Sequence, residues 1–167
     1  MIGVNGASVC LCDWEIGDRV EKTLRRMDKY LTPFEEQDAL WLIEETQRQL
    51  DEYFSGNLRK FDLPIKAFGT DFQRRVWQAL LDVPYGRIAR YRDIAAIVGL
   101  PRGVRAVASA IGANPLSILV PCHRVIGSDG SLTGYARGLG TKSYLLELES
   151  RIHDISDEIV NGKEVFH

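Results

Sequence analysis

The pattern of apolar and polar residues in the first third of the chain predicts one strand and two helices. Residues 7–14 alternate between apolar and polar types as a strand does, and residues 17–31 have the spacing of an amphipathic helix. A second helix begins at Thr32, where Pro33 takes the first helical position and Glu35 completes a capping box. It runs to about Phe54 and stops before Gly56. We expect its apolar stripe to consist of Leu40, Ile43, Gln47, Leu50 and Phe54.

The remaining two thirds of the chain have a pattern dominated by short helices. Thr70 and Gln73 repeat the capping signal and open a helix to about Val83. Two short helices, at 91–98 and 101–113, are joined by Gly99, Leu100 and Pro101, which fits a helix-turn-helix or a helical hairpin in a core. A buried run at 117–120, a hairpin tip at 128–131, a glycine-bracketed loop at 134–138 and a last helix at 141–151 follow.

These elements predict two domains and a tail. Residues 1–65 form an α/β domain, and residues 57–69, with Pro64, connect it to a second, mainly helical domain at 66–152. The polar, acidic segment 153–167 is expected to be a loosely held tail. A chain of 167 residues has room for this arrangement and for a hydrophobic core.

The composition excludes several classes of protein, and the positive and negative charges are distributed unevenly along the chain. Hydrophobic residues make up 45% of the sequence and charged residues 26%, as in ordinary globular proteins. We expect no membrane span and, from the uncharged start of the chain, no signal peptide. The net charge of −2 hides a segment, 66–145, with 11 Lys and Arg against 4 Asp, whereas the rest of the chain carries −9. Such a basic segment favours phosphate binding, although chance differences between solvated helix faces are the alternative.

The three cysteines point to a reduced protein with one reactive thiol. Their odd number and spacing do not fit a disulfide framework, which favours the cytosol. Cys10 and Cys12 alternate along the predicted strand with both thiols on one face, and we interpret them as small buried residues because no second Cys or His pair follows at ligand spacing. We expect no metal and no cofactor.

Cys122 carries the candidate chemistry of the chain. A cysteine attacks as its thiolate, and His123 and Arg124 are neighbours that can favour this form. A Cys–His pair also needs an acid to orient the imidazole, and Glu147 and Glu149 on the last helix are the nearest candidates. A buried cysteine beside a surface histidine is the alternative.

A longer motif around Cys122 resembles a known family. Asn114-Pro115, Ile118 and Pro121-Cys122-His123-Arg124-Val125-Ile126, followed by Gly134-Tyr135, resemble the active-site signature of the O6-alkylguanine-DNA alkyltransferases, also called methylated-DNA–protein-cysteine methyltransferases. The resemblance extends over 72–151, more weakly over 50–57, and is faint in 1–49. It implies a small N-terminal ribonuclease-H-like α/β domain followed by a winged helix-turn-helix domain that binds DNA and transfers the alkyl group.

The resemblance implies a role for each matching residue at the reaction centre. Cys122 would accept the alkyl group from O6 of guanine, and from O4 of thymine, and keep it. His123 would be its base through a water, with Glu149 orienting His123 and Asn114 bracing the turn. The substrate base would be bound by the Tyr135 hydroxyl and by the backbone of Val125 and Ala136, with Arg137 at the rim of the pocket.

The resemblance also implies how DNA is held. Arg105 would be the arginine finger that replaces the extruded base in the stack, and Tyr91 would crowd the target phosphate. The small residues Gly103 and Ala106 would let their helix approach the minor groove. Gln73, Arg92 and Ser128 would touch the DNA backbone. Because a thioether is not hydrolysed under mild conditions, one turnover per molecule is expected.

Some positions depart from the family's pattern. Arg137 stands where some members have Gly, and we expect its bulk at the pocket rim to slow reaction with benzyl-sized adducts relative to methyl. Ala136 replaces a Ser and Ala108 a frequent Gly, both at little cost. The N-terminal region is short, so we expect the first hairpin to be incomplete. Zinc ligands of some relatives are not matched.

The predicted function is therefore direct-reversal DNA repair by a single-turnover, base-flipping methyltransferase. The predicted partner is duplex DNA containing O6-alkylguanine, bound through the minor groove by a monomer that can be cooperative on DNA. The predicted location is the cytoplasm at the nucleoid, or the nucleus of a eukaryote. The alternatives are a lesion sensor, which would lack a cysteine at position 122, a cysteine hydrolase, and a helix-turn-helix transcription factor.

Overall fold

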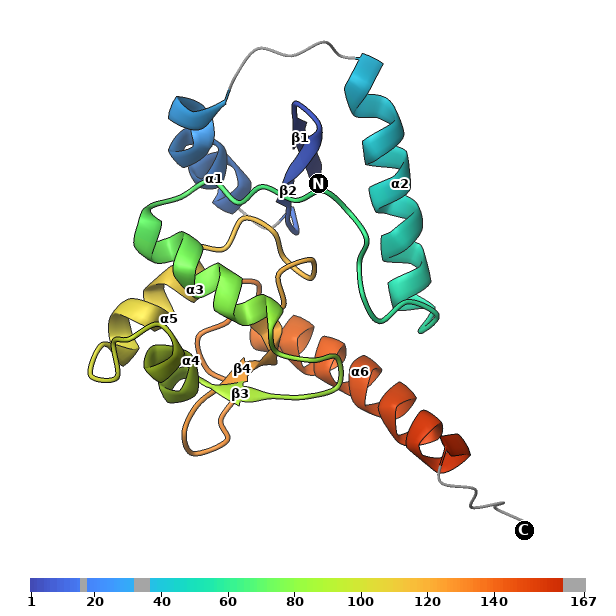
Figure 1. Cartoon of the computed structure of the whole chain (residues 1–167), viewed down its shortest axis with the longest axis vertical. Helices are drawn as coiled ribbons and strands as arrows, with labels where there is room; N and C mark the ends of the chain where they lie inside the picture. The colour runs from blue at the N-terminus through green and yellow to red at the C-terminus, as the bar shows by residue number, and fades with distance from the viewer. Residues whose placement is uncertain (16–17, 32–36, 161–167) are drawn as a thin grey trace.

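The computed structural model describes residues 1–15, 18–31 and 37–160, and it is a mixed α/β structure. Figure 1 shows a hairpin between two helices in one half of the molecule, and a cluster of shorter helices with a long last helix in the other. The elements are β1 (Ile2–Asn5), β2 (Ser8–Cys12), α1 (Arg19–Met27), the 3-10 helix η1 (Asp28–Tyr30), α2 (Gln37–Phe54), α3 (Asp71–Leu81), β3 (Ala89–Arg90), α4 (Tyr91–Ile97), α5 (Val104–Gly112), the 3-10 helix η2 (Cys122–Arg124), β4 (Val125–Ile126) and α6 (Leu139–Val160).

The predicted first strand is present as one half of an antiparallel hairpin. β1 pairs with β2 through a turn at Gly6, whose φ of +58° suits a glycine, so the hairpin is formed and not missing its partner strand. Four successive residues of β2, 9–12, are buried, so both faces of this strand are covered. Cys10 and Cys12 are free and buried, as the sequence predicts.

β2 joins the two halves of the molecule because it bonds to backbone from both. Val9 exchanges backbone hydrogen bonds with the segment 64–66, and Cys12 does the same with the segment 115–117. The segment 115–117 follows α5 and leads to η2. Asp13, the residue after β2, is thereby brought to the turn that carries Cys122.

The buried face of α2 differs from the predicted stripe. Leu50 is buried as predicted, but Leu40 is 59% exposed and Gln47 is exposed. The other buried positions are Ala39, Leu42, Thr46, Gln49 and Tyr53. Polar residues reach this face because their hydrogen bonds are satisfied: Thr46 donates to the carbonyl of Leu42, and the Gln49 amide pairs with the backbone of Asp62. A pattern that counts only apolar residues misses such a face. The predicted cap at 32–35 lies outside the described residues.

The helices of the second half begin and end close to their predicted positions. Thr70 and Gln73 form the predicted capping box at the start of α3. Trp77 of α3 donates its indole N–H to the carbonyl of Ala110 on α5 at 2.8 Å, which ties the two helices together. α4 and α5 pack against each other, and Gly99 between them has a φ of +76°.

Two predictions for the C-terminal third need correction. Residues 127–131 form the predicted tight turn, but β4 does not continue a hairpin, because it pairs in parallel with β3. The last helix does not end near Arg151: α6 continues to Val160, through the first half of the segment expected to be a tail, and it extends away from the body in Figure 1. No helix of the described residues is long and apolar enough to cross a membrane.

Candidate active site and nucleic-acid surface

Asn114 braces the turn that leads to Cys122. Its amide nitrogen donates to the carbonyls of Leu116 and Val120, and its side-chain oxygen accepts from the N–H of Leu116. The same amide lies 3.2 Å from the thiol of Cys122. Ile118 in this turn has a φ of +71°, which is strained for a β-branched residue and which these bonds hold in place. The predicted bracing contacts are therefore present.

Cys122 is a free thiol in the interior of the protein. It opens the 3-10 helix η2 and is 2% exposed. The segment that carries Cys122 is a short 3-10 turn followed by the two residues of β4. This placement shields the thiol from solvent.

Of the two acids proposed to orient His123, the structure selects Glu149. The Nε2 atom of His123 lies 2.8 Å from Oε1 of Glu149, and both side chains are buried. Burial and the surrounding cations lower the pKa of His123, although its bond to Glu149 works in the other direction. Glu147 is on the solvent side of α6, where it pairs with Arg151.

The charge state of Glu149 defines the tautomer of His123. Burial alone would raise the pKa of Glu149, but the hydrogen bonds from His123 and Arg124 lower it to about 2. An ionised carboxylate only accepts hydrogen bonds, so Nε2 of a neutral His123 must carry the proton. Nδ1 is then the unprotonated nitrogen, and it is buried without a hydrogen-bond partner among the described protein atoms.

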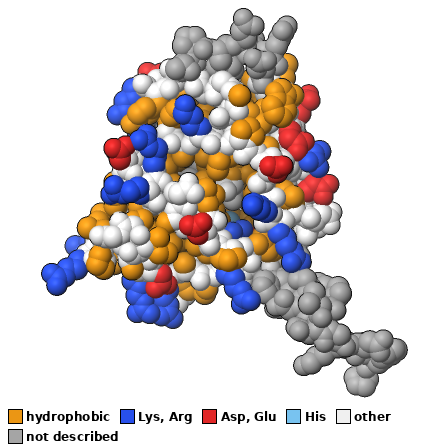
Figure 2. Space-filling view, viewed as in Figure 1, with side chains coloured by type: hydrophobic (Ala, Val, Ile, Leu, Met, Phe, Trp, Pro, Cys, Tyr) orange, Lys and Arg blue, Asp and Glu red, His pale blue; other side chains and the backbone are white. Residues whose placement is uncertain are grey.

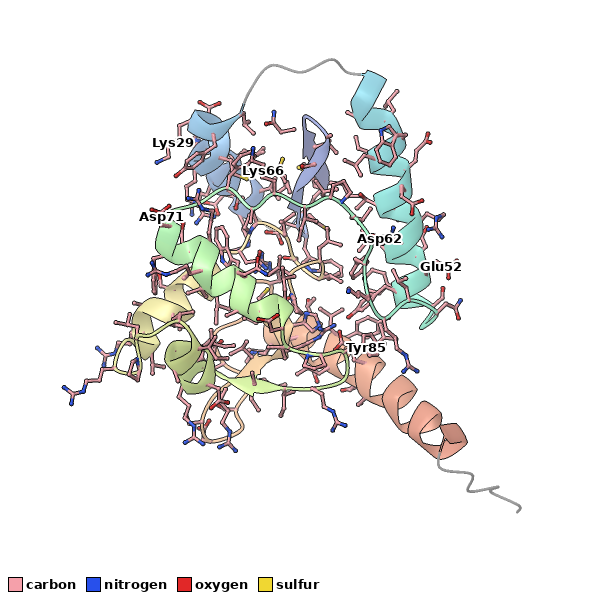
Figure 3. All side chains as sticks on the ribbon, in the orientation of Figure 1. Lys29, Glu52, Asp62, Lys66, Asp71 and Tyr85 are labelled. Carbon is pink, nitrogen blue, oxygen red and sulfur yellow. The ribbon has the colours of Figure 1, made fainter. Side chains whose placement is uncertain are left out.

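Glu149 is held by three further groups whose contact with it the sequence did not predict; one of them, Arg124, was expected to act on Cys122 instead. Arg124 donates to both of its oxygens, at 2.9 and 3.0 Å, the Tyr53 hydroxyl donates at 2.7 Å, and the N–H of Gly86 donates at 3.2 Å. Tyr85 lies between the end of α2 and α6 (Figure 3), and its ring meets Tyr53 and Arg124. The signal available in the sequence for Tyr53 is the weak resemblance over 50–57.

The sequence predicts Arg137 at a pocket rim, whereas in the structure Arg137 is buried beside the thiol. It is 3% exposed, its Nη1 atom lies 3.8 Å from Sγ of Cys122, and its other nitrogens donate to Asp13. The reason is that Asp13, 124 residues earlier, offers a buried carboxylate. Tyr135 packs against this guanidinium, and its hydroxyl is buried with no partner in the described protein. Val125 is buried and Ala136 exposed.

The residues expected to bind DNA lie on or near the two-helix unit of α4 and α5, with two exceptions. Arg105, Ala106 and Arg92 are exposed on these helices. Gly103 allows Leu100 to pack closely, since a Cβ there would lie 2.2 Å from the leucine side chain. Ser128 is exposed in the turn after β4, and Gln73 lies at the start of α3, where its side chain caps the helix.

Tyr91 starts α4 but points inward. It is 7% exposed, and its hydroxyl donates to the carbonyl of Thr133 at 2.9 Å. A contact between Tyr91 and a phosphate therefore stays a prediction.

Three of the cationic side chains in the basic segment 66–145 are buried in the interior. Arg124, Arg137 and Lys142 are buried, and Lys142 donates to the carbonyls of Val125 and Thr133. The eight that are exposed are Lys66, Arg74, Arg75, Arg87, Arg90, Arg92, Arg102 and Arg105. In Figure 2, Lys and Arg side chains lie around α4 and α5 and also along α1, while several acidic side chains lie over α2.

Together, the fold and the site define a protein with a buried cysteine, a His–Glu pair and a two-helix unit that carries exposed arginines. Residues 71–151 match the family described as 6-O-methylguanine DNA methyltransferase, DNA binding domain. The chain is similar to a methylated-DNA–protein-cysteine methyltransferase of Methanosarcina barkeri, with 56% identity over 105 residues, 63% of this chain and 66% of the relative. A protein of the same name from Mycobacterium tuberculosis is 54% identical over 60% of this chain and 61% of the relative.

Comparison with solved structures identifies the same family, and the similarity extends over more of the chain. A crystal structure of Mycobacterium tuberculosis O6-methylguanine methyltransferase has a TM-score of 0.69 and 41% identity, covering 87% of this chain and 82% of that one. A structure of OGT from the same organism in complex with DNA has a TM-score of 0.64 and 50% identity, covering 65% and 68%. The chain belongs to the methylated-DNA–protein-cysteine methyltransferase family. Its matched part spans 66% of the length of the Methanosarcina barkeri relative and 61% of the length of the Mycobacterium tuberculosis relative.

Proposed function

We propose that this protein repairs alkylated DNA by transferring the alkyl group from O6 of guanine, and from O4 of thymine, to Cys122, once per molecule. The observation that carries the proposal is the buried His123–Glu149 pair next to Cys122, with Nδ1 of His123 as an unpartnered base. The relatives that share this segment are named for the same reaction.

The chemistry follows from the groups at the site. His123 takes the proton of Cys122 at Nδ1, through a water, while Nε2–H stays bonded to Glu149 and stabilises the positive charge that forms on the ring. The Cys122 thiolate attacks the alkyl carbon, so an S–C bond forms as the C–O6 bond breaks. The electron pair goes to the guanine, and the buried Tyr135 hydroxyl donates a hydrogen bond to the leaving base. No cofactor is needed for these steps.

The substrate must leave the base stack to reach a buried thiol. Extruding a base costs a few kcal/mol, and the exposed Arg105 of α5 offsets part of this by entering the stack. We propose that α4 and α5 act as a winged helix-turn-helix in the minor groove, and that the hairpin and helices before residue 66 are a reduced ribonuclease-H-like domain. The DNA complex of the Mycobacterium tuberculosis relative supports DNA as the partner.

The proposed protein is a monomer that works on DNA in the cytoplasm, at the nucleoid. Lesion repair has to be independent of the surrounding sequence, so the binding energy comes from phosphates and falls with salt.

One experiment tests the proposed function. The protein is incubated with a duplex that contains O6-methylguanine, and the intact protein is then weighed. We expect a gain of one methyl group, mapped by peptide mass to Cys122, and a reaction that stops at one equivalent. Methyl release with repeated turnover would indicate a hydrolase, and tight binding without a mass change would indicate a lesion sensor.

A further inference from the structure

The surroundings of the Cys122 thiol include a second charged group that the proposed mechanism does not use. Arg137 lies with Nη1 3.8 Å from Sγ. Its Nε and Nη2 atoms donate to the two oxygens of Asp13, at 2.8 and 3.1 Å, and Nη2 also donates to the carbonyl of Asn114. Since these bonds hold two of the three guanidinium nitrogens, Nη1 is left facing the thiol.

The carboxylate that holds Arg137 is itself fixed in the interior. Asp13 accepts from the N–H of Trp14, from the hydroxyl of Ser117 at 2.8 Å and from Arg19 at 3.1 Å. Its side chain is fully buried. A planar guanidinium that forms two parallel bonds to a fixed carboxylate has little freedom to turn away from the sulfur.

The cluster of Asp13, Arg19 and Arg137 is not electrically neutral. It contains two guanidinium groups and one carboxylate, so one net positive charge remains, and Arg137 is the member that lies against Sγ. Burial works against the charged form of Arg137, but Cys122 and Asp13 raise its pKa on balance. A positive charge next to a thiol favours the thiolate.

Resting on the proposed alkyl transfer, we propose that Arg137 is a further active-site residue that sets the reactivity of Cys122, and that Asp13, after β2, is the positioning residue that holds Arg137 against the sulfur. The N-terminal hairpin then contributes to the chemistry of a cysteine more than 100 residues later in the chain. The two residues then have different roles: His123 removes the proton from the thiol, and Arg137 stabilises the negative charge that remains on the sulfur.

Other titratable groups around the sulfur also affect the pH dependence that the test measures. The charged and titratable side chains that interact electrostatically with Cys122 are Tyr91 on α4, Tyr135, Arg137 and, on α6, Lys142. His123 is the next residue in η2. Burial lowers the pKa of Lys142 to about 8, so its titration contributes to every pH profile. The informative quantity is therefore the difference between the profiles of two variants.

The test compares two reactions of Cys122 as a function of pH: single-turnover methyl transfer from DNA, and alkylation by iodoacetamide without DNA, followed at the Cys122 peptide. Burial raises the pKa values of Cys10 and Cys12 to about 11 and about 12, so these thiols stay protonated near neutral pH. In Arg137→Gln we expect the midpoint of both profiles to move up by about one pH unit, a tenfold loss of rate below the midpoint. Arg137→Lys, which keeps the charge, should restore at least half of this shift.

Two further variants separate the roles of the cluster. Arg19→Gln is the matched control: Arg19 shares Asp13 but donates to the carbonyl of Gly112 and not to the thiol, so it should shift the midpoint by less than half as much. If Asp13 acts through Arg137, then Asp13→Ala raises the midpoint, and the double variant Asp13→Ala/Arg137→Gln shifts it no further than Arg137→Gln alone.

The outcomes are distinguishable. A uniform loss of rate in Arg137→Gln with an unchanged midpoint would mean that Arg137 only supports the structure, and would overturn the proposal. Additive shifts in the double variant would overturn the role of Asp13. If Asp13→Ala does not fold, the comparison of Arg137→Gln with Arg137→Lys decides, since Arg19 still pairs with Asp13 in both. If the wild type takes no methyl from DNA while the iodoacetamide profiles shift, the proposed function fails and the role of Arg137 stands.

Discussion

The hydroxyl of Tyr53 on α2 donates a 2.7 Å hydrogen bond to Oε1 of Glu149 on α6, 96 residues later in the chain. The same oxygen accepts from Nε2 of His123. An N-terminal helix therefore helps to hold the carboxylate that bonds to His123, as the segment after β2 holds Arg137 through Asp13.

Tyr53→Phe removes this bond and leaves the ring in place. We expect a loss of about 2 kcal/mol in the free energy of unfolding, since the acceptor is charged and buried, and a severalfold slower methyl transfer. Urea unfolding and single-turnover kinetics measure the two effects. Tyr144→Phe, on the exposed side of α6, is the control and should change neither.

Glu149→Gln keeps the shape of the side chain and removes its charge. Nε2 of His123 loses its anionic acceptor, and we expect methyl transfer to slow by about 10²-fold. Arg124 loses its buried counter-ion, so the protein should also be less stable by about 3 kcal/mol. Glu147→Gln, on the same helix but exposed, should retain the wild-type rate. Equal rates in the two variants would contradict the role of Glu149.

Stability is expected to fall in acid because of the same carboxylate. The folded-state pKa of Glu149, about 2, lies below its ordinary value of 4.5, so its contribution is complete above pH 4.5 and is lost as the pH falls towards 2. Each pKa unit corresponds to about 1.4 kcal/mol, so the loss is on the order of 3 kcal/mol. Asp13, whose pKa is also lowered, adds to it.

His123 acts in the same direction from a higher pH. Its pKa is lowered in the folded protein, so protonation of the unfolded chain begins to oppose folding as the pH falls below 6.5. Urea unfolding measured between pH 7 and pH 3 should show a continuous fall that is smaller in Glu149→Gln. A flat profile would contradict these assignments.

Gly134→Ala tests the packing of the active-site loop. Gly134 has a φ of +72°, and a Cβ there would lie 2.5 Å from the hydroxyl of Tyr91, so Tyr91 has to shift, which disturbs its bond to Thr133. We expect a destabilisation of about 2 kcal/mol. Gly140→Ala, in α6 with open space around the added methyl group, should be neutral or slightly stabilising. Differential scanning calorimetry separates the two.

The salt dependence of DNA binding tests which cations face phosphates. Arg92→Gln and Arg102→Gln should weaken binding and each reduce the slope of log K against log salt by about 0.9. Arg25→Gln and Arg48→Gln should do neither, because these arginines lie on α1 and α2, outside the basic segment 66–145, where Glu21 and Glu45 pair with them. Fluorescence anisotropy at several salt concentrations provides the slopes. Equal slopes for all four variants would mean that the charge division along the chain is chance.

Local signals in the sequence predicted most helix positions but not their buried faces. The cap of Thr70 and Gln73, the stop at Gly99 and the turn at 127–131 depend on neighbouring residues only, and the structure confirms them. The predicted stripe of α2 was right at Leu50 and wrong at Leu40, because Thr46 and Gln49 are buried with their hydrogen bonds satisfied. The end of the last helix was wrong because an acidic, polar composition does not by itself end a helix.

At the site, the motif around Cys122 identified the candidate nucleophile, its histidine and the bracing asparagine, because these residues are close in sequence and their chemistry is set by residue type. The choice of Glu149 over Glu147 required the resemblance, and the structure then placed Glu149 on the histidine. The burial of Arg124, Arg137 and Lys142 could not be read from a charge count, which treats every cation as exposed.

The sequence by itself determined most helix positions, the candidate nucleophile and the family, since propensity, capping and motif spacing are local properties of the chain. Only the tertiary structure decided which distant groups meet at that thiol. Asp13 and Tyr53 reach the site because β2 bonds to the segment 115–117 and α2 packs near α6, and a buried charge is stable only where such partners converge. Because of that requirement, Arg137 lies buried beside the Cys122 thiol and not at a pocket rim, which the sequence around position 137 does not show.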